Sequence, residues 1–306
     1  MRRIWVIIGM VAVLGVFMGC GCVDDGDIEE YTIVRYRAPN WTSDNKIVFV
    51  KDSNFVRDRH TMWGIEGNIE GSYEVLTLCE INSDGSGYKE IGQVCKSEHH
   101  AYSIGINGVS SAGDWVVFDL REEEDTKHRI CVMRRDGSDF YNTGVIGMHP
   151  DFSPDGSKIV YEKPDSGIWI MNRDGSNNHC IVPDADAKYP AWSPDDSLIG
   201  YLYWGSYEGY GYATFILDIT SDTIFSSYPG FYFYDWGEGG TDEIFVGLYW
   251  GGFGKVNINT GKVDTINMCV SHVSMDGDFF IGEDKNGYFV CRKDGSNKWY
   301  LKDLIE

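Results

Sequence analysis

Short apolar runs alternate with tight-turn signals along residues 149–182. The runs at residues 158–161 and 168–171 are rich in β-branched and aromatic side chains, as is typical of half-buried strands. Asp155-Gly156 precedes the first run and Asp174-Gly175 follows the second, and Asp-Gly supplies the positive φ that a hairpin turn needs. With one further run on either side, the pattern predicts a meander of four antiparallel strands.

The same unit recurs along most of the chain. Phe-Ser-Pro-Asp-Gly at residues 152–156 returns as Trp-Ser-Pro-Asp-Asp at 192–196 and, earlier, as Trp-Thr-Ser-Asp-Asn at 41–45. Weaker copies lie at 109–118, 235–246 and 273–281, and the Asp-Gly-Ser turn appears at 82–86, 135–138, 173–176 and 293–296. We count six units, spaced by about forty residues except for a longer first unit, and four-stranded units at this spacing are typical of β-propeller blades.

One strand-like run is left over by this count. The six units occupy residues 38–302, so the run at residues 28–35 precedes the first unit. A closed ring needs its last blade joined to its first, because open strand edges invite aggregation. We therefore expect residues 31–35 to pair into the sixth blade as its outer strand. The predicted fold is an all-β, six-bladed propeller of four-stranded antiparallel blades, closed by this N-terminal strand in the last blade.

The repeat resembles a known family. Phe-Ser-Pro-Asp-Gly-x-x-Ile-x-Tyr at residues 152–161, followed by Ile-Trp-x-Met-Asn-x-Asp-Gly-Ser at 168–176, is similar to the WD-like repeats of TolB-type six-bladed propellers. The resemblance covers nearly all of the chain after its N-terminal segment, and it is best in the third and fourth units and worst in the fifth. It implies the fold and, by analogy, a non-enzymatic platform that binds protein partners, although a fold does not fix a function.

The N-terminus is typical of an export signal. Arg2 and Arg3 are followed by about fifteen apolar residues and by Gly19-Cys20, which predicts a signal peptide over residues 1–20. A cysteine at the cleavage site resembles a lipoprotein signal, with Phe17 where leucine is usual, so Cys20 is the expected lipid-attachment residue. An uncleaved anchor and an ordinary signal are the alternatives. All three place the protein at or beyond the cell membrane, facing outside the cytoplasm.

Residues 21–30 are then an acidic tether, and residues 31–306 form a single propeller domain. The formal charge of the chain is −21 at pH 7. Such a charge repels nucleic acid and anionic lipid surfaces, and the sequence has no basic stripe to overrule it. We therefore expect no nucleic-acid partner, and we attribute the charge itself to solubility.

The sequence contains none of the common catalytic motifs. There is no Gly-x-Ser-x-Gly, no His-Glu-x-x-His, no phosphate-binding loop and no Cys-x-x-Cys pair, so we predict no catalytic residue, cofactor or metal site. The Asp-Gly turns lack the ligand spacing of calcium loops. Cys79 and Cys131 occupy strand positions and are expected to be buried as small hydrophobic residues. His149 and His272 open inner strands, where we expect packed or hydrogen-bonded side chains.

The two faces of the predicted ring differ. The Asp-Gly turns of one face are short and nearly uniform, whereas the connections on the other face vary and include a long insertion at residues 52–72. Aromatic residues and glycines gather in the variable connections of the fourth and fifth blades. Tyrosine and tryptophan dominate binding hot spots. The predicted partner-binding residues are Trp63, Tyr203, Trp204, Tyr207, Tyr210, Tyr249 and Trp250. Alternatively, some of these side chains continue the sheets as core.

Three functions fit this sequence. The first is a membrane-anchored propeller that binds a protein or peptide of the cell envelope and has no enzymatic activity. The second is a propeller that binds carbohydrate or acts on it as a lyase or hydrolase, for which the charged candidates at the channel mouth are Arg59, His60, His99 and His100. A cluster of histidines and acids there would favour catalysis, and scattered histidines would favour binding. The third is a surface lipoprotein whose ring is a structural spacer.

Overall fold

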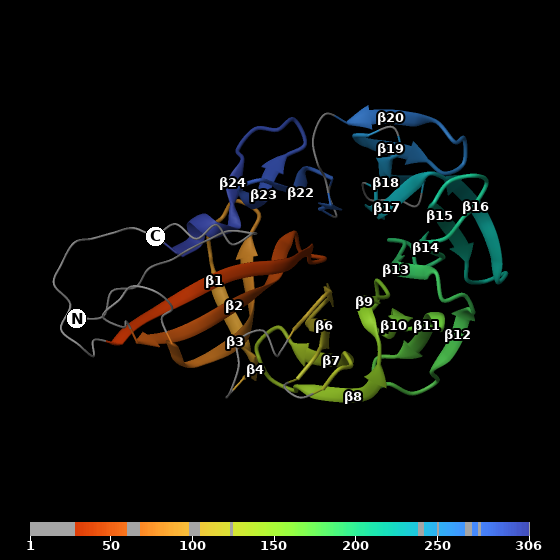
Figure 1. Ribbon diagram of the computed structural model, residues 1–306. Helices are drawn as coiled ribbons and strands as arrows, with labels where there is room; N and C mark the ends of the chain where they lie inside the picture. Colours follow the sequence, from red (N-terminus) through yellow and green to blue (C-terminus); the bar gives the residue numbers. More distant parts are fainter. Residues whose placement is uncertain are drawn as a thin grey trace.

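Six small antiparallel sheets stand around a central axis in this computed structural model (Figure 1). The structure describes residues 28–59, 68–97, 105–122, 125–237, 242–249, 251–266, 271–274 and 277–305. In every sheet the four strands follow one another in chain order, so each blade is a simple meander. The architecture confirms the predicted six-bladed propeller and its six repeat units.

The first three blades contain twelve strands: β1 (Ile28–Trp41), β2 (Lys46–Arg59), β3 (Asn68–Asn82), β4 (Lys89–Lys96), β5 (Val109–Ala112), β6 (Trp115–Leu120), β7 (Arg129–Arg134), β8 (Tyr141–Ile146), β9 (Met148–Phe152), β10 (Lys158–Lys163), β11 (Gly167–Asn172) and β12 (His179–Val182). The last three contain β13 (Ala187–Trp192), β14 (Leu198–Tyr203), β15 (Ala213–Asp218), β16 (Thr223–Pro229), β17 (Phe231–Trp236), β18 (Glu243–Leu248), β19 (Phe253–Asn257), β20 (Val263–Ile266), β21 (His272–Val273), β22 (Phe279–Asp284), β23 (Gly287–Arg292) and β24 (Trp299–Tyr300). A short 3-10 helix, η1 (Leu301–Ile305), ends the described chain.

The repeated turns are built by local hydrogen bonds. Between β9 and β10, the Oδ1 atom of Asp155 accepts bonds from the Ser153 hydroxyl at 2.7 Å and from the Ser157 backbone N–H at 2.9 Å. Gly156 has a φ of 68°, which a side-chain-bearing residue rarely adopts. Between β11 and β12, Asp174 accepts in the same way from Ser176. Both turns lie where the repeats predicted them.

The core lies between neighbouring blades, where the apolar sides of adjacent sheets face each other. Tyr161 of the third blade is fully buried, and its hydroxyl donates a 2.7 Å hydrogen bond to Asn178. A Cβ atom on Gly147 would lie 2.3 Å from the Tyr161 ring, so only glycine fits there. Cys79 and Cys131 are fully buried, as predicted, and burial raises the pKa of both thiols.

The predicted closure of the ring is wrong. Residues 31–35 belong to β1, which is the inner strand of the first blade and pairs with β2 in a register that sets Tyr31 opposite Val56 and Arg35 opposite Asp52. The insertion at 52–72 explains this result, because residues 52–59 prolong β2 and offer an adjacent antiparallel edge. The last blade already holds four strands of its own, β21 to β24.

Side-chain packing between the first and last blades therefore closes the ring. Ile281, Val290 and Leu301 of the last blade and η1 are buried against Ile47 and Phe49 of the first. The indole N–H of Trp299 also donates a 3.1 Å hydrogen bond to the backbone carbonyl of Ser83. Figure 1 shows the C-terminal strands in blue beside the orange strands of the first blade.

β1, β2 and β3 continue beyond the ring as a three-stranded arm (Figure 1). β1 begins at Ile28, within the last part of the expected acidic tether. The expected signal segment and Cys20 lie outside the described residues. In the described part of the chain, no helix is both long and apolar enough to cross a membrane.

Candidate functional site

A two-residue turn presents the predicted aromatic residues of the fourth blade. Tyr207 and Tyr210 exchange two backbone hydrogen bonds of 2.9 Å, which closes a tight turn around Glu208 and Gly209. Both turn residues have positive φ, 49° and 87°, as this kind of turn requires. The connection between β14 and β15 is therefore an ordered hairpin tip that fixes the directions of Tyr207 and Tyr210.

The structure brings aromatic rings of the fourth and fifth blades together. Tyr210 meets Tyr249 edge-on at a centroid distance of 4.9 Å. Trp204 stacks on Tyr212 at 6.2 Å and meets Tyr232 edge-on at 6.0 Å. Trp204 is 52% exposed, Tyr210 36% and Tyr249 61%. We call Trp204, Tyr210, Tyr212, Tyr232 and Tyr249 the aromatic face.

Tyr203 and Tyr207 lie below the aromatic face. Their rings contact each other at 6.5 Å, and both meet Phe215 of β15 edge-on, at 5.8 Å and 4.9 Å. Both side chains are half-buried. They support the hairpin from beneath and expose less of their rings to a ligand than Trp204 or Tyr249. Sequence reasoning gave all of these residues the same role, because periodicity cannot distinguish a supporting ring from an exposed one.

Several predicted site residues cannot be placed. Trp63, Trp250, His60, His99 and His100 lie outside the described residues. Arg59 ends β2 in the arm, and its side chain is not described. The candidate constellation of Arg59 and the three histidines at the channel mouth therefore stays a prediction.

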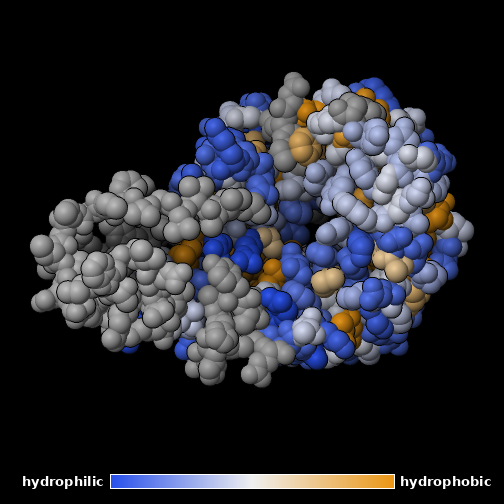
Figure 2. Space-filling model, in the orientation of Figure 1, coloured by the Kyte–Doolittle hydropathy of each residue, from blue (hydrophilic) through white to orange (hydrophobic). Residues whose placement is uncertain are grey.

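The second feature is the hollow at the centre of the ring (Figure 2). It is a cavity of about 410 Å³ lined by the inner strands of all six blades. One position of the repeat supplies a ring of side chains around this cavity. In the third blade it is the residue directly before Phe152, and the strand pairing places the equivalent residue in every other blade. In blade order these are Asn40, Ser110, Asp151, Ala191, Asp235 and His272.

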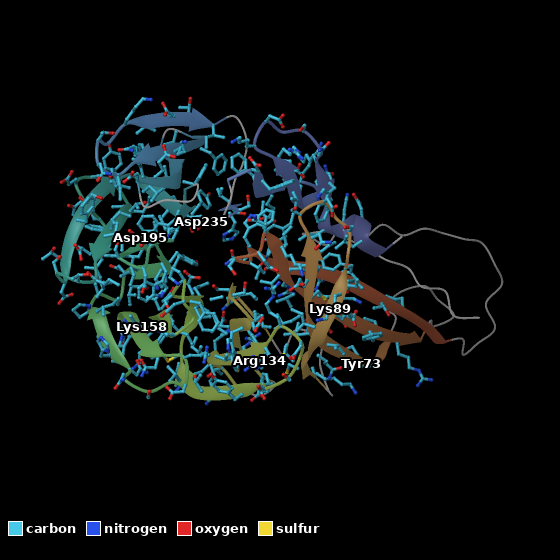
Figure 3. The ribbon with its side chains drawn as sticks, turned by 180° about the vertical axis from the view of Figure 1, so that it is seen from behind. Tyr73, Lys89, Arg134, Lys158, Asp195 and Asp235 are labelled. Atoms are coloured by element: carbon cyan, nitrogen blue, oxygen red, sulfur yellow. The ribbon has the colours of Figure 1, made fainter. Side chains whose placement is uncertain are left out.

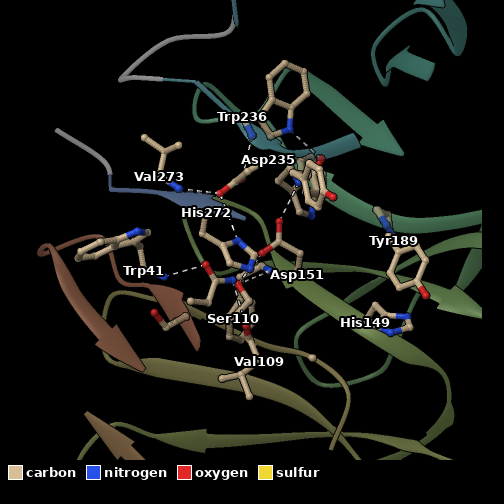
Figure 4. A pocket seen from close by; sticks show the side chains of 18 of the residues that line it. Trp41, Val109, Ser110, His149, Asp151, Tyr189, Asp235, Trp236, His272 and Val273 are labelled. Atoms are coloured by element: carbon tan, nitrogen blue, oxygen red, sulfur yellow. Dashed lines mark hydrogen bonds and ion pairs between the residues drawn. The ribbon is translucent and has the colours of Figure 1, made fainter. Parts of the chain in front are cut away.

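Hydrogen bonds from this ring of residues join the second blade to the third, the third to the fourth and the fifth to the sixth. Ser110 donates a 2.5 Å hydrogen bond to the Oδ1 atom of Asp151. The Oδ2 atom of Asp151 accepts a 2.8 Å bond from the backbone N–H of Trp192 in the fourth blade. Asp235 accepts a 3.3 Å bond from the backbone N–H of Val273 in the sixth blade. Figure 3 shows Asp235 near the ring centre, and Figure 4 shows these contacts from close by.

Burial changes the acidity of Asp151. Asp151 is half-buried in the wall of the cavity, and this desolvation raises its pKa to about 6, against the hydrogen bonds from Ser110 and Trp192 that stabilise the charged form. The nearby charge of Asp235 raises the pKa further, and His272 lowers it. His272 lies 3.3 Å from the Asp235 carboxylate. The channel thus contains an acid that titrates close to physiological pH.

Within the described ranges, histidine–carboxylate pairs occur at three separate places. They are His128 with Asp119 at 2.6 Å, His149 with Glu162 at 3.1 Å, and His272 with Asp235 at 3.3 Å. The first two lie within the second and third blades, and the third joins the fifth and sixth. Glu162 also pairs with Lys188 at 3.1 Å, and these partners lower its pKa in spite of burial. Among the described residues, no group of three or more histidine, cysteine or acidic side chains could hold a metal ion.

Asp151 and Asp235 were not among the predicted site residues, although the sequence contains a signal for them. Each stands directly before the aromatic residue of its unit, Phe152 or Trp236, in a motif that is otherwise apolar up to its turn. A carboxylate at an inner-strand position indicates a channel-facing or blade-joining role. The aromatic face, in contrast, was indicated directly by the gathering of tyrosine, tryptophan and glycine in two connections.

The comparisons with known proteins concern the fold. No protein-family model and no curated protein matches the sequence. Among solved structures, the chain is similar to TolB from Acinetobacter baumannii, with a TM-score of 0.54 and 11% identity over 87% of this chain and 78% of that one. It is also similar to a chain in the mitotic checkpoint complex, with a TM-score of 0.50 and 10% identity over 82% of this chain and 87% of that one. At these identities the likeness shows the fold alone, a TolB-like six-bladed propeller.

Proposed function

We propose that this chain is an exported, membrane-anchored propeller that binds a protein or peptide of the cell envelope and performs no chemistry of its own. The aromatic face carries this proposal. Residues of two neighbouring blades hold these rings in two contacting groups, Trp204 with Tyr212 and Tyr232, and Tyr210 with Tyr249, and Trp204 and Tyr249 remain more than half exposed. Large aromatic side chains that are ordered and yet exposed are typical of binding hot spots, because little entropy is lost when a partner covers them.

Among the residues that the structure describes, the scatter of titratable groups supports binding over catalysis. The histidine–carboxylate pairs lie in different blades, and each acid also holds a backbone group or a neighbouring side chain, as Asp235 holds the N–H of Val273. Ser110, the hydroxyl nearest to Asp151, donates its proton to that carboxylate and joins two blades. A nucleophile, a base and an orienting group in one constellation would be needed for acyl transfer.

The proposed location rests on the N-terminal sequence. Residues 1–20 have the charge, apolar run and Gly19-Cys20 ending of a lipoprotein signal. Lipid attachment at Cys20 would hold the ring at the membrane surface, because acyl chains bind bilayers by about 0.8 kcal/mol per buried CH₂ group. Metabolic labelling with a radioactive fatty acid tests this location, since Cys20→Ser should abolish the label.

The partner-binding proposal is tested by affinity capture of the full-length chain from detergent-solubilised membranes of its host. The test variant is Trp204→Ala/Tyr249→Ala. The matched control is Ile224→Ala/Phe225→Ala, which removes two apolar side chains that are each 47% exposed on the outer strand of the fourth blade. We expect the native chain and the control to capture the same defined protein and the test variant to lose it. Equal capture by all three, with unchanged thermal unfolding, would contradict the proposal.

Carbohydrate binding is the second candidate. Its supporting observation is the exposed indole of Trp204, since exposed tryptophan and tyrosine rings also stack on sugar rings. The same capture experiment distinguishes the two candidates if the bound material is divided into protein and glycan. Glycan that is retained by the control variant and lost with Trp204→Ala/Tyr249→Ala would put the carbohydrate function first.

A further inference from the structure

The aromatic face lies in a strongly acidic part of the chain. Residues 183–257 contain eleven acidic residues, two lysines and no arginine. Both lysines are already paired, Lys188 with Glu162 at 3.1 Å and Lys255 with Glu243 at 2.8 Å. A ligand on this face therefore meets no uncompensated positive charge from this segment.

Three exposed carboxylates border the face. The backbone N–H of Trp204 donates a 2.7 Å hydrogen bond to the carbonyl of Asp186, which fixes the two main chains side by side. Asp184 and, to a smaller extent, Asp186 raise the pKa of the adjoining Tyr203, so both negative charges act on this surface. Glu208 stands at the hairpin tip between Tyr207 and Tyr210. None of these three acids forms an ion pair with any residue in the described ranges.

Elsewhere in the ring, half-buried tryptophan rings carry a cation from the protein itself. Lys163 lies 3.7 Å above the ring of Trp169, and Arg134 and Arg173 lie 4.4 Å from the ring of Trp115. Such cation–π contacts contribute about 0.5–2 kcal/mol each. In the described part of the chain, no lysine or arginine lies over Trp204 or Tyr249, so the exposed parts of these rings have no protein cation and lie in the same segment as the unpaired carboxylates.

We propose that the aromatic face binds a basic segment of a partner protein, whose lysine or arginine side chains stack on Trp204 and Tyr249 and pair with Asp186 and Glu208. The inference rests on the proposed function and names the chemical class of its partner. Charge complementarity decides the class. An acidic peptide or an anionic sugar would be repelled by the three carboxylates, and a neutral sugar carries no charge for them to attract.

Synthetic peptides of one length provide the test, one rich in lysine and arginine and one rich in aspartate and glutamate, with a neutral oligosaccharide as a third probe. Each is titrated against the full-length chain in detergent. We expect the basic peptide to bind and the other two to fail. Trp204→Ala/Tyr249→Ala should weaken its binding about tenfold, since two cation–π contacts are lost. Asp186→Asn/Glu208→Gln should also weaken it, and more strongly at low salt.

The control variant is Asp222→Asn/Asp303→Asn, which removes the same charge from exposed positions outside the face. It should leave the affinity unchanged. Equal weakening by both acid variants would mean unspecific attraction to a chain of charge −21 and would overturn the inference. Preferred binding of the oligosaccharide or the acidic peptide would overturn it as well.

Failure of this inference can be distinguished from failure of the platform. Capture of an envelope protein that requires Trp204 and Tyr249 but not Asp186, Glu208 or low salt would support the partner-binding proposal and contradict the inference of a basic segment. If capture is indifferent to Trp204 and Tyr249, the platform itself is wrong.

Discussion

The ring of Tyr210 meets the ring of Tyr249 edge-on, with centroids 4.9 Å apart and planes at 84° to each other. Tyr210 comes from the connection between β14 and β15, and Tyr249 follows β18, so the contact joins two blades at the surface. Such a contact contributes about 0.5–1.5 kcal/mol beyond the area it buries. It orders both loops before any partner arrives, which reduces the entropy that binding would otherwise cost.

Gly230 is the position on which Tyr210 depends most. It has a φ of 73°, and a Cβ atom there would lie 2.6 Å from the Tyr210 ring. We expect Gly230→Ala to lower the free energy of unfolding by about 1–3 kcal/mol and to weaken partner capture, because the ring must move away from Tyr249. Gly211→Ala is the matched control, since a Cβ atom at Gly211 meets nothing within 4 Å. Chemical denaturation of both variants checks this, and equal effects would count against it.

Asp151 makes stability depend on pH in a direction opposite to that of acids such as Asp44 and Asp284, whose pKa is lowered. Its pKa is raised from 3.8 to about 6, so the folded protein retains a proton that the unfolded chain has released. The resulting stability is present below about pH 4 and is lost as the pH rises to about 6 and above.

Asp151→Asn should remove this dependence. We expect the difference in unfolding free energy between the native chain and the variant to change by about 3 kcal/mol between pH 4 and pH 7, in favour of the native chain at the acidic end. Urea denaturation at several pH values measures it. A difference that is constant over this range would show that burial does not shift the acidity of Asp151.

The closure of the ring gives another prediction. Leu301 is buried between the first and last blades, so Leu301→Ala should cost about 2–5 kcal/mol and speed amide hydrogen exchange in both β2 and β22. Val34, buried in β1 of the arm, is the comparison. Val34→Ala should speed exchange in β1 and β2 and leave β22 unchanged. Faster exchange in β22 after Val34→Ala would restore the idea that the N-terminal strand closes the ring.

The number of blades could be predicted from the sequence because turn chemistry is local. Asp155-Gly156 and its repeats select tight turns wherever they occur, and counting them counts the blades. The partner of residues 31–35 could not be predicted in this way. Two edges compete for this strand, and the choice depends on how far residues 52–59 prolong β2, which the alternation of apolar residues does not reveal.

The location of the aromatic face could be predicted from the sequence, but the exposure of its individual rings could not. The clustering of Tyr203, Trp204, Tyr210 and Tyr249 in two variable connections indicated the surface, since these connections lie on one side of any propeller. Which rings would be exposed depends on the packing of Tyr203 and Tyr207 against Phe215, a contact that crosses the hairpin. The acidity of Asp151 depends on its burial and on Ser110, Trp192, Asp235 and His272 from other blades, and no local pattern contains that information.

The central claim is that the aromatic face is where a protein partner binds. A photoreactive amino acid placed at Tyr249 in the host's own protein tests it most directly, with the same substitution at Ile224 as the comparison, because both positions are exposed and only the first lies on the face. The account predicts that light cross-links position 249 to one defined envelope protein and leaves position 224 without that product. Cross-linking to the same protein from position 224 alone, or from neither position, would contradict it.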